Sequence, residues 1–419
     1  MGSSSLTQTL ELQVPSEVTL LQQVVVHTPG RELSLVSPEN RLELLFDDIL
    51  FEHKARQEHQ QMCNLFMRVV GREDAVLQIR TLLAETFLIE EARAYFVEEL
   101  IRIMPERNFQ AFSHELLALS PEELLDFALT GQSHLPINAL PLPNLMFTRD
   151  LCAIVHNRAI LSQAATAARA RESILVRMIF LYHPQLSAFK DQLIMLPETV
   201  TFEGGDLLVA SPELILIGHS ERTSFGAVME IARNLLTLTP VQHVIMVDLP
   251  KQRASMHLDT VFTFADFDTC VSFPPIVETD LYNVMHLTAG DSPESLHSEV
   301  YPCLRHALED LYPYPLTFIP CGGEDPLNQV REQWTDGANL FAMAPGVVVG
   351  YERNLHTFNA LRDHGFRVVT ARGFLEYYAE SEYEPGEKIA IKLEGNELSR
   401  GRGGPRCMTM PIHRQPVNP

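Results

Sequence analysis

The strongest constraint on the fold of this chain is a change of sequence pattern early in the chain. The apolar run at residues 24–26 is followed at once by turn residues at 27–30, which predicts a buried strand that ends there. From residue 51 to residue 129, apolar residues recur at helical spacing with almost no strand-like run. Past Pro143, short β-rich runs return, separated by polar turns and helical stretches. We therefore expect an α/β body that an all-helical insertion interrupts after its first strand.

The same pattern sets the expected domain boundaries. Residues 1–50 and 141–419 are predicted to form one catalytic α/β domain, and residues 51–140 an inserted helical bundle. Within the α/β part, two hairpins are predicted at residues 153–161 and 207–217, each around a polar turn. With 419 residues, 46% of them hydrophobic and 21% charged, the chain can bury a large core.

One helix start inside the insertion is explicit. Residues 120–123 read Ser-Pro-Glu-Glu, which combines an N-cap serine, a proline at the first helical position and a capping-box glutamate. Gly131 has the residue type that ends helices. The sequence therefore predicts a helix between these two signals.

The chain is strongly acidic, with 32 Lys and Arg against 54 Asp and Glu and a formal net charge of −22. This charge argues against nucleic acid or an anionic membrane as the principal partner and suits a small cationic substrate. Acidity that only keeps the protein soluble is the simpler alternative. No apolar run approaches the roughly 18 residues of a membrane helix, and residues 1–6 lack the basic and apolar regions of a signal peptide. We therefore expect a cytoplasmic protein.

The six cysteines are few for the length of the chain and form no C-x-x-C pair, which argues against a disulfide framework and a zinc ribbon. They are Cys63, Cys152, Cys270, Cys303, Cys321 and Cys407. Each is either a small buried apolar side chain or a candidate nucleophile. The H-E-x-x-H motif and both glycine-rich nucleotide motifs are missing, so neither a metal nor a nucleotide cofactor is expected.

Five short segments stand out because polar, charged and glycine residues interrupt an otherwise apolar pattern, each at the end or start of a predicted strand. They are residues 144–150, 202–206, 256–260, 321–325 and 401–407. Loops at strand ends are where functional sites are commonly built.

Three of these segments carry residue types that suit catalysis. Cys407 follows a glycine-rich loop with arginines, in which backbone can approach a ligand and positive charge can lower a thiol pKa; a flexible surface loop is the alternative. His257 and Asp259 share one side if the segment is extended, although a metal half-site or a structural pair would look the same. Glu203 and Asp206 flank two glycines that would let a substrate or a strand come close, or that simply form a turn.

Taken together and in order, seven segments from about Val24 to Pro411 resemble the arginine deiminase family. They are Phe-Thr-Arg-Asp (147–150), Glu-Gly-Gly-Asp (203–206), Ser-Glu-Arg-Thr (220–223), His-Leu-Asp-Thr (257–260), Arg-Glu-Gln-Trp (331–334), Gly-Val-Val-Val-Gly (346–350) and Arg-Gly-Gly-Pro-Arg-Cys-Met (402–408). The resemblance implies the pentein fold, a five-bladed α/β propeller of ββαβ-like units with the site in a central channel and an inserted helical bundle. It also implies no metal, no cofactor and a homo-oligomer.

The same resemblance implies the roles of individual residues. Cys407 would be the nucleophile, His257 the general acid and base, and Glu203 the carboxylate that positions the histidine. The implied substrate contacts are the guanidinium clamp Asp150 and Asp259, the carboxylate-binding arginines Arg169, Arg222 and Arg402, and the pocket residues Asn144, Phe147 and Asp206. Arg171 lies two residues after Arg169, so a register slip would exchange them.

The implied reaction is hydrolysis of the guanidinium of free L-arginine to citrulline and ammonia through a thiouronium on Cys407. Three alternatives stay open. One is another guanidine-modifying pentein, an amidinotransferase or a dimethylarginine hydrolase. The others are a non-catalytic arginine-binding pentein and an ordinary cysteine protease.

Overall fold

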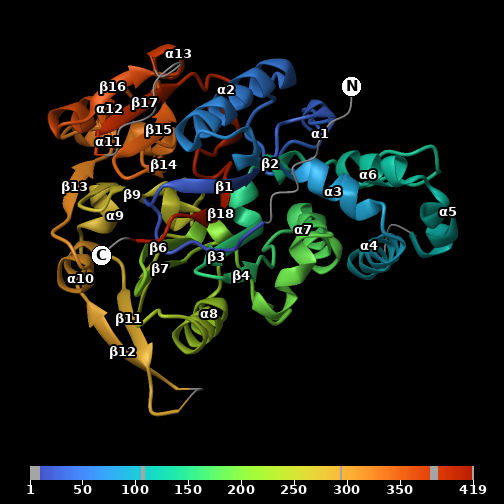
Figure 1. Cartoon of the computed structure of the whole chain (residues 1–419), viewed down its shortest axis with the longest axis horizontal. Coiled ribbons are helices and arrows are strands. Elements are labelled where there is room, and N and C mark those ends of the chain that lie inside the picture. The colour runs from blue at the N-terminus through green and yellow to red at the C-terminus, as the bar shows by residue number, and fades with distance from the viewer. Residues whose placement is uncertain (1–9, 105–108, 293–294, 378–385, 418–419) are drawn as a thin grey trace.

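The computed structural model describes residues 10–104, 109–292, 295–377 and 386–417. Its strands fall into five separate sheets with helices between them, so the chain has the expected α/β class (Figure 1). The chain start, which contributed to the expected cytoplasmic location, lies outside the described residues. Within the described ranges, no helix is both long and apolar enough to cross a bilayer.

Every sheet contains the same three-strand core: an antiparallel pair, and a third strand that pairs in parallel with the second. In the first sheet the elements are β3 (Cys152–Val155), β4 (Arg158–Leu161), α7 (Ala170–Tyr182) and β5 (Leu193–Ile194). In the second they are β6 (Leu207–Ser211), β7 (Leu214–His219), α8 (Phe225–Leu238) and β8 (His243–Asp248), extended by β11 (Val284–Ala289) and β12 (Leu296–Tyr301). Both predicted hairpins, β3–β4 and β6–β7, are confirmed.

The next two sheets follow along the chain. The third has β9 (Phe262–Asp266), β10 (Thr269–Ser272) and β13 (Thr317–Pro320), with α9 (Pro274–Val277) and α10 (Leu304–Leu311) in the connection. The fourth follows α11 (Pro326–Trp334) and has β14 (Phe341–Ala344), β15 (Val347–Tyr351), α12 (Leu355–Asp363), β16 (Arg367–Thr370), α13 (Ala371–Tyr377) and β17 (Ile389–Leu393).

The fifth sheet joins the two ends of the chain. Its antiparallel pair is β18 (Met410–Arg414) with β1 (Leu21–Val26), and β2 (Val76–Gln78) lies parallel to β1. The connection from β1 to β2 holds α1 (Arg31–Ser34) and α2 (Glu52–Val70). The first predicted strand is therefore the centre of a sheet that only the C-terminal strand completes.

The expected all-helical insertion is corrected at its start. Strand β2 lies inside residues 51–140 and pairs with β1, and the buried face of α2 packs in one core with β1, β15 and β17. With only three residues, β2 is too short for a recognisable alternation, so its pairing with β1 could not be predicted from local pattern.

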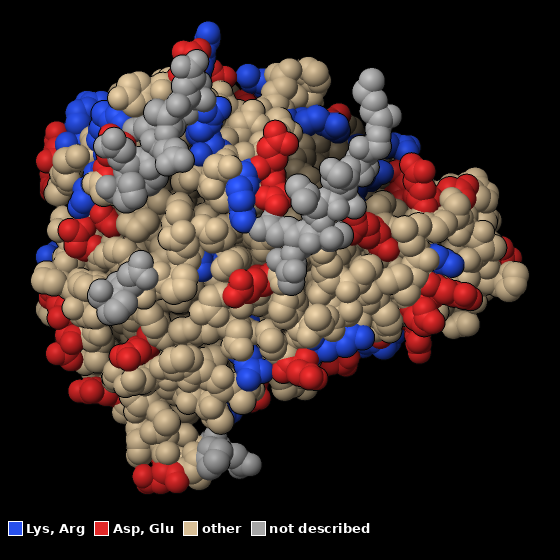
Figure 2. Space-filling model, viewed as in Figure 1, with Lys and Arg blue, Asp and Glu red and all other residues tan. Residues whose placement is uncertain are grey.

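The remaining helices of residues 51–140 form a lobe at the right of Figure 1. They are α3 (Ile79–Phe87), α4 (Glu90–Ile103), α5 (Ser113–Ala118) and α6 (Pro121–Thr130). The lobe shares a continuous core with the α/β part, because Phe87 and Phe96 belong to the same buried cluster as Leu175 and Ile179 of α7. On the face in Figure 2, acidic side chains gather over this lobe with single basic ones between them.

The predicted helix start at residues 120–123 is confirmed. The Ser120 hydroxyl accepts a hydrogen bond from the Glu123 backbone, and the Glu123 carboxylate accepts one from the Ser120 backbone, which completes the capping box. The helix ends at Gly131, which has a φ of 70° and approaches the backbone of Ala139 too closely for any side chain.

Candidate active site

The candidate catalytic residues occupy equivalent loops of different sheets. Asp150, Glu203, His257 and Cys407 each lie shortly before the first strand of a sheet, β3, β6, β9 and β18 respectively. In three of these loops the polar segment forms a short 3-10 turn, at Thr148–Leu151, Gly204–Asp206 and Leu258–Thr260. The arrangement of the sheets thus brings together residues that are far apart in the sequence.

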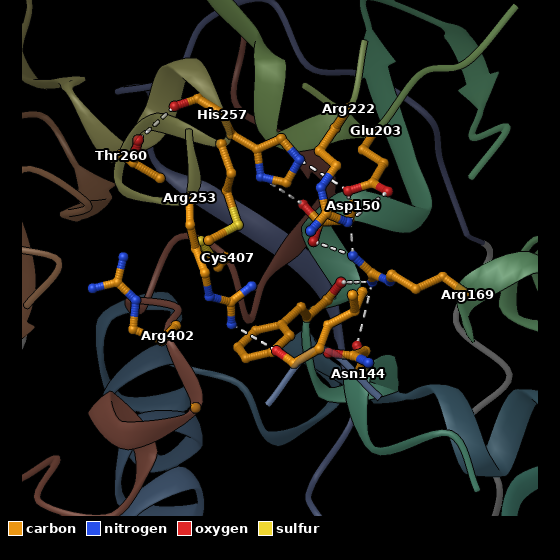
Figure 3. A pocket seen from close by; sticks show the side chains of 14 residues that line it. Asn144, Asp150, Arg169, Glu203, Arg222, Arg253, His257, Thr260, Arg402 and Cys407 are labelled. Atoms are coloured by element: carbon orange, nitrogen blue, oxygen red, sulfur yellow. Dashed lines mark hydrogen bonds and ion pairs between the residues drawn. The ribbon is translucent and has the colours of Figure 1, made fainter. Parts of the chain in front are cut away.

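These loops line one cavity (Figure 3). Its lining contains Leu45, Asn144, Phe147, Asp150, Arg169, Glu203, Arg222, Arg253, Met256, His257, Thr260, Gly401, Arg402 and Cys407. Of the predicted site residues, Asp259 and Asp206 are absent from this lining.

His257 is held by carboxylates. Its Nε2 lies 2.9 Å from Glu203 Oε2, and its Nδ1 lies 3.6 Å from Asp150 Oδ1. Burial alone would lower the pKa of His257, but the charges of Asp150, Asp206 and Glu203 and the hydrogen bond to Glu203 outweigh burial and raise it to about 9. The imidazole is therefore protonated at neutral pH and able to donate a proton.

Gly205 allows the close packing of His257 and Asp150. A Cβ on Gly205 would lie 2.7 Å from His257 Nδ1 and 2.9 Å from Asp150 Oδ1. The glycines of the Glu-Gly-Gly-Asp segment were predicted to admit a substrate or a strand, and the groups that approach Gly205 are the imidazole and the carboxylate. Gly403, in the loop before Cys407, similarly makes room for the Phe147 ring.

Cys407 is buried beside acidic groups. Its Sγ lies 3.8 Å from Asp259 Oδ2, and its backbone N–H donates to Asn339 Oδ1 at 3.2 Å. Burial, together with the charges of Asp259, Asp150 and Asp336, raises the pKa of this thiol well above its usual value. Burial and these charges thus favour the neutral thiol over the thiolate.

The two predicted clamp carboxylates each have a buried oxygen without a hydrogen-bond partner among the described residues. These atoms are Asp150 Oδ1 and Asp259 Oδ1. Their second oxygens are taken by arginines, since Asp150 Oδ2 lies 2.6 Å from Arg169 Nη1 and Asp259 Oδ2 lies 2.8 Å from Arg406 Nη1. The site therefore has unused acceptors for a cationic donor.

Arg169 lines the cavity, but its guanidinium contacts acidic side chains rather than open space. It pairs with Asp150, with Glu172 at 2.8 Å and with Glu203 at 3.5 Å. Arg171 instead donates to the backbone carbonyl of Leu140 and lies outside the lining. In this structure Arg169 thus binds Asp150, one of the two carboxylates of the predicted guanidinium clamp.

The other two predicted arginines also line the cavity. Arg222 Nη1 lies 3.5 Å from Glu203 Oε1. Arg402 takes a left-handed backbone conformation, with φ 63°, and its guanidinium stacks 3.5 Å from the centre of the Trp334 ring and donates to the Trp334 carbonyl. The Arg-Glu-Gln-Trp segment at 331–334 thus supports an arginine of the cavity.

The predicted pocket residues divide into two groups. Asn144 and Phe147 line the cavity, and Asn144 donates to the Leu44 carbonyl at 2.8 Å. Asp206 does not line it: its carboxylate accepts from the Leu258 backbone at 2.9 Å and from the Ser220 hydroxyl at 2.5 Å. The structure gives Asp206 a supporting contact to the loop that carries His257.

Several residues of the site were not predicted. Asn339 precedes β14, in the loop equivalent to those of the candidate catalytic residues, and joins Cys407 to the backbone carbonyl of Asp259. Its segment is short and apolar on both sides of a lone amide, so no local signal marked it. Glu17 and Arg406 form a buried ion pair next to Asp259, and only the position of Arg406 beside the cysteine pointed to it.

Asp150, Glu203 and His257 have ligand atoms within 4.8 Å of one another, which is close enough for a metal ion. Their chemistry does not fit one well. Glu203 Oε2 is bonded to His257 Nε2, and the positive charge of Arg169 lies against both carboxylates. A divalent cation would have to displace these partners, so the expectation of no metal stays our prediction.

Comparison with solved structures defines the class of fold. The amidinotransferase SxtG from Microseira wollei superposes with a TM-score of 0.54 at 13% identity, over 97% of this chain and 98% of that chain. The N-terminal domain of ArgZ, an arginine dihydrolase from cyanobacteria, superposes with a TM-score of 0.51 at 13% identity, over 94% of this chain and 97% of that chain. The chain therefore shares the α/β fold of these two proteins.

Sequence comparison goes further. The family model "Arginine deiminase" matches residues 110–414. An arginine deiminase of Bacillus cereus (strain B4264) is 35% identical, over 97% of this chain and 99% of the relative. One of Listeria monocytogenes serotype 4a is 33% identical, over 96% of this chain and 98% of the relative. The chain belongs to the arginine deiminase family, as its sequence segments predicted.

Proposed function

We propose that this chain is an arginine deiminase, a hydrolase that converts the guanidinium of free L-arginine to L-citrulline and ammonia. The observation that carries the proposal is a single buried cavity at which Cys407, the His257–Glu203 pair and the carboxylate of Asp150 meet. Membership of the arginine deiminase family supports the same reaction.

The clamp explains how a guanidinium is recognised. Buried carboxylate oxygens without partners are costly, and a guanidinium with five N–H donors can satisfy Asp150 Oδ1 and Asp259 Oδ1 together. The contact between Arg169 and Asp150 supports this role, because Asp150 already accepts a guanidinium there. Substrate binding on this account moves Arg169 away from Asp150.

The substrate's own charge then favours the nucleophile. Carboxylates and burial hold Cys407 as a thiol, and a guanidinium cation next to it offsets both and favours the thiolate, with the thiol proton released to solvent. The thiolate attacks the guanidinium carbon, and His257 donates a proton to the departing nitrogen, which leaves as ammonia. The product of this step is a thiouronium on Cys407.

Hydrolysis completes the cycle. His257, now neutral, accepts a proton from a water molecule that attacks the thiouronium carbon. The second tetrahedral species then collapses to citrulline, and its hydroxyl proton passes to the departing sulfur, which restores the Cys407 thiol. Glu203 keeps the imidazole oriented through both proton transfers, since it bonds His257 Nε2 at 2.9 Å. Each step uses only side chains of the cavity, so we propose no metal and no cofactor.

We assign the α-carboxylate of the substrate to the arginines of the cavity, Arg222 and Arg402 with Arg169. Arg402 supports this assignment best, because it is only partly paired: its Nε lies 4.0 Å from Asp47, and the face of its guanidinium rests on Trp334. Asn144 and Phe147 would line the space for the aliphatic part of the substrate.

We also propose that the five sheets form the blades of a five-bladed α/β propeller around this cavity. The repeated three-strand core supports this architecture, as does the position of the catalytic residues before the first strands. In this division the helical insertion is α3–α6, and α2 and β2 belong to the catalytic domain.

The surroundings of the protein are part of the proposal. All six cysteines are unpaired, which fits a reducing compartment such as the cytoplasm.

We expect a homo-oligomer, for which the exposed apolar side chains of Leu281 and Val300, beside and within the β11–β12 hairpin, are available surface. Light scattering on the eluting protein would measure the mass, and a monomer would contradict this part.

The test of the reaction is incubation of the purified protein with L-arginine in metal-free buffer. We expect equimolar citrulline and ammonia from the wild type and from Cys321→Ala, a buried cysteine outside the cavity, and no product from Cys407→Ala. Ornithine with an amidino adduct would indicate an amidinotransferase instead. Thermal stabilisation by arginine without any product would indicate a binding protein.

A further inference from the structure

One charged group near the cavity has no part in the proposed reaction. The Arg406 side chain is 1% exposed and is not part of the lining of the cavity that its neighbour Cys407 lines. Its Nε and Nη2 donate to Glu17 at 3.1 and 3.0 Å, Nη1 donates to Asp259 at 2.8 Å, and Nη2 also donates to the Leu207 carbonyl at 2.8 Å. The guanidinium is thus a buried bridge between two carboxylates.

Glu17 is itself fixed. It belongs to the segment before β1, and its backbone N–H donates to the Val209 carbonyl at 2.8 Å while its Oε1 accepts from the Val209 N–H at 3.3 Å. Burial would raise the pKa of Glu17, but Arg406, Arg149 and Arg414 outweigh it and lower the pKa to about 2. Glu17 is therefore a permanent anion held on strand β6.

We propose that Arg406, anchored by Glu17, is a positioning residue that fixes Asp259 so that its Oδ1 faces the substrate guanidinium beside Cys407. The geometry carries this inference: Arg406 takes Asp259 Oδ2 and leaves Oδ1 without a hydrogen-bond partner among the described residues. The inference rests on the proposed clamp. It adds that Arg406 also influences the charge next to the Cys407 thiol.

The influence of Arg406 on the Cys407 thiol follows from the distances that join both groups to Asp259. Asp259 Oδ2 lies 3.8 Å from Cys407 Sγ and 2.8 Å from Arg406 Nη1, so Arg406 partly cancels the anion that most disfavours the thiolate after burial. Glu17 acts in the opposite direction, because it neutralises part of the Arg406 charge. Asp150 and Asp336 add further negative charge at the thiol, and the protonated His257 adds positive charge across the cavity.

The test needs no turnover. Alkylation of Cys407 by iodoacetamide in the substrate-free protein, read by mass spectrometry between pH 7 and pH 10, reports the thiolate fraction. We expect Arg406→Met to move the pH dependence of the rate upward and Glu17→Gln to move it downward. Arg406→Lys keeps the charge and should stay close to the wild type in alkylation.

The effect on substrate is measured separately. Arg406→Lys loses the planar fork that holds Asp259, so we expect kcat/KM for L-arginine to fall by roughly a hundredfold in both Arg406 variants. The control is Arg414→Met, since Arg414 is as deeply buried but donates to the carbonyls of Thr19 and Ala342. It should lower thermal stability without changing the pH dependence of alkylation.

Opposite shifts in Arg406→Met and Glu17→Gln would support the proposal. Shifts of the same sign, or no shift in folded protein, would overturn it. The wild type could fail to turn over arginine while the two variants still shift alkylation in opposite directions. That result would refute the proposed function and leave intact the effect of Arg406 and Glu17 on the Cys407 thiol.

Discussion

At the scale of single residues, the protonation of His257 depends on its carboxylate neighbours. Its folded-state pKa of about 9 lies above the ordinary value of 6.5, so its contribution to stability is full below about pH 6.5 and is lost as pH rises through about 9. In Glu203→Gln the hydrogen bond that His257 donates loses its charged acceptor, and we expect the pKa of His257 to fall. Imidazole NMR, assigned with His257→Asn, would measure both values; a wild-type value near 6.5 would contradict the account.

Gly205 gives a second prediction about His257. An added Cβ would overlap the imidazole and the Asp150 carboxylate, so Gly205→Ala should displace one of them and reduce kcat/KM by roughly a hundredfold. Gly373→Ala, in the remote helix α13, is the control and should be nearly neutral for activity. Circular dichroism would check that both variants fold. Full activity of Gly205→Ala would refute the close packing.

Much of the candidate site could be predicted from residue types and the family resemblance. Cys407, His257, Glu203 and Asp150, which the sequence marked as candidates, line one cavity. Their pairings could not be predicted, because the contact between Arg169 and Asp150 depends on a three-dimensional arrangement of buried charges. Long-range partners of this kind leave no local pattern in a sequence.

At the scale of elements, the capping box of α6 is a measurable local contribution. Ser120→Ala removes the side-chain acceptor for the Glu123 backbone, and we expect a loss of about 1 kcal/mol in the free energy of unfolding. Glu122→Gln, in the same first turn, changes only an exposed charge and should lower the free energy of unfolding by roughly a few tenths of a kcal/mol. Urea unfolding would compare the two. Equal effects would contradict the capping assignment.

The elements themselves were predictable to different degrees. The helix that follows Ser120 and the β3–β4 and β6–β7 hairpins carry their signals locally, in caps and alternation. The short strand β2 does not, since it is stabilised by parallel pairing with β1 across a connection that contains α2. Pairing between distant segments such as these cannot be predicted from local sequence pattern.

At the scale of the whole molecule, the lobe and the α/β part should unfold together because they share one core. Phe96 in α4 is fully buried and packs edge-on against Phe87, with ring centres 5.4 Å apart. Phe96→Ala should cost about 3–5 kcal/mol and lower the melting temperature of the entire protein. Fluorescence of Trp334, the single tryptophan, reports the end of α11 and its contact with Arg402, and far-ultraviolet circular dichroism reports the helices. Two separate transitions would contradict the shared core.

The repetition of the fold was visible in the sequence only through the family resemblance. The five sheets share a strand pattern, but the units differ in length and in inserted elements, such as β11–β12 in one and α13 in another. Side chains of unlike chemistry, among them Asp150, Asn339 and Cys407, occupy equivalent loops. Because each loop makes different contacts, the repeat is not visible in the residue types.

The most direct test of the proposed mechanism is the chemical identity of the group bound to Cys407 during turnover. The protein would be mixed with L-arginine labelled in its α-carbon, quenched in acid and digested, and the Cys407 peptide weighed. The account predicts an adduct of arginine less ammonia that keeps the label. An adduct that holds only the amidino carbon and its nitrogens, without the label, or a label on any other residue, would contradict it.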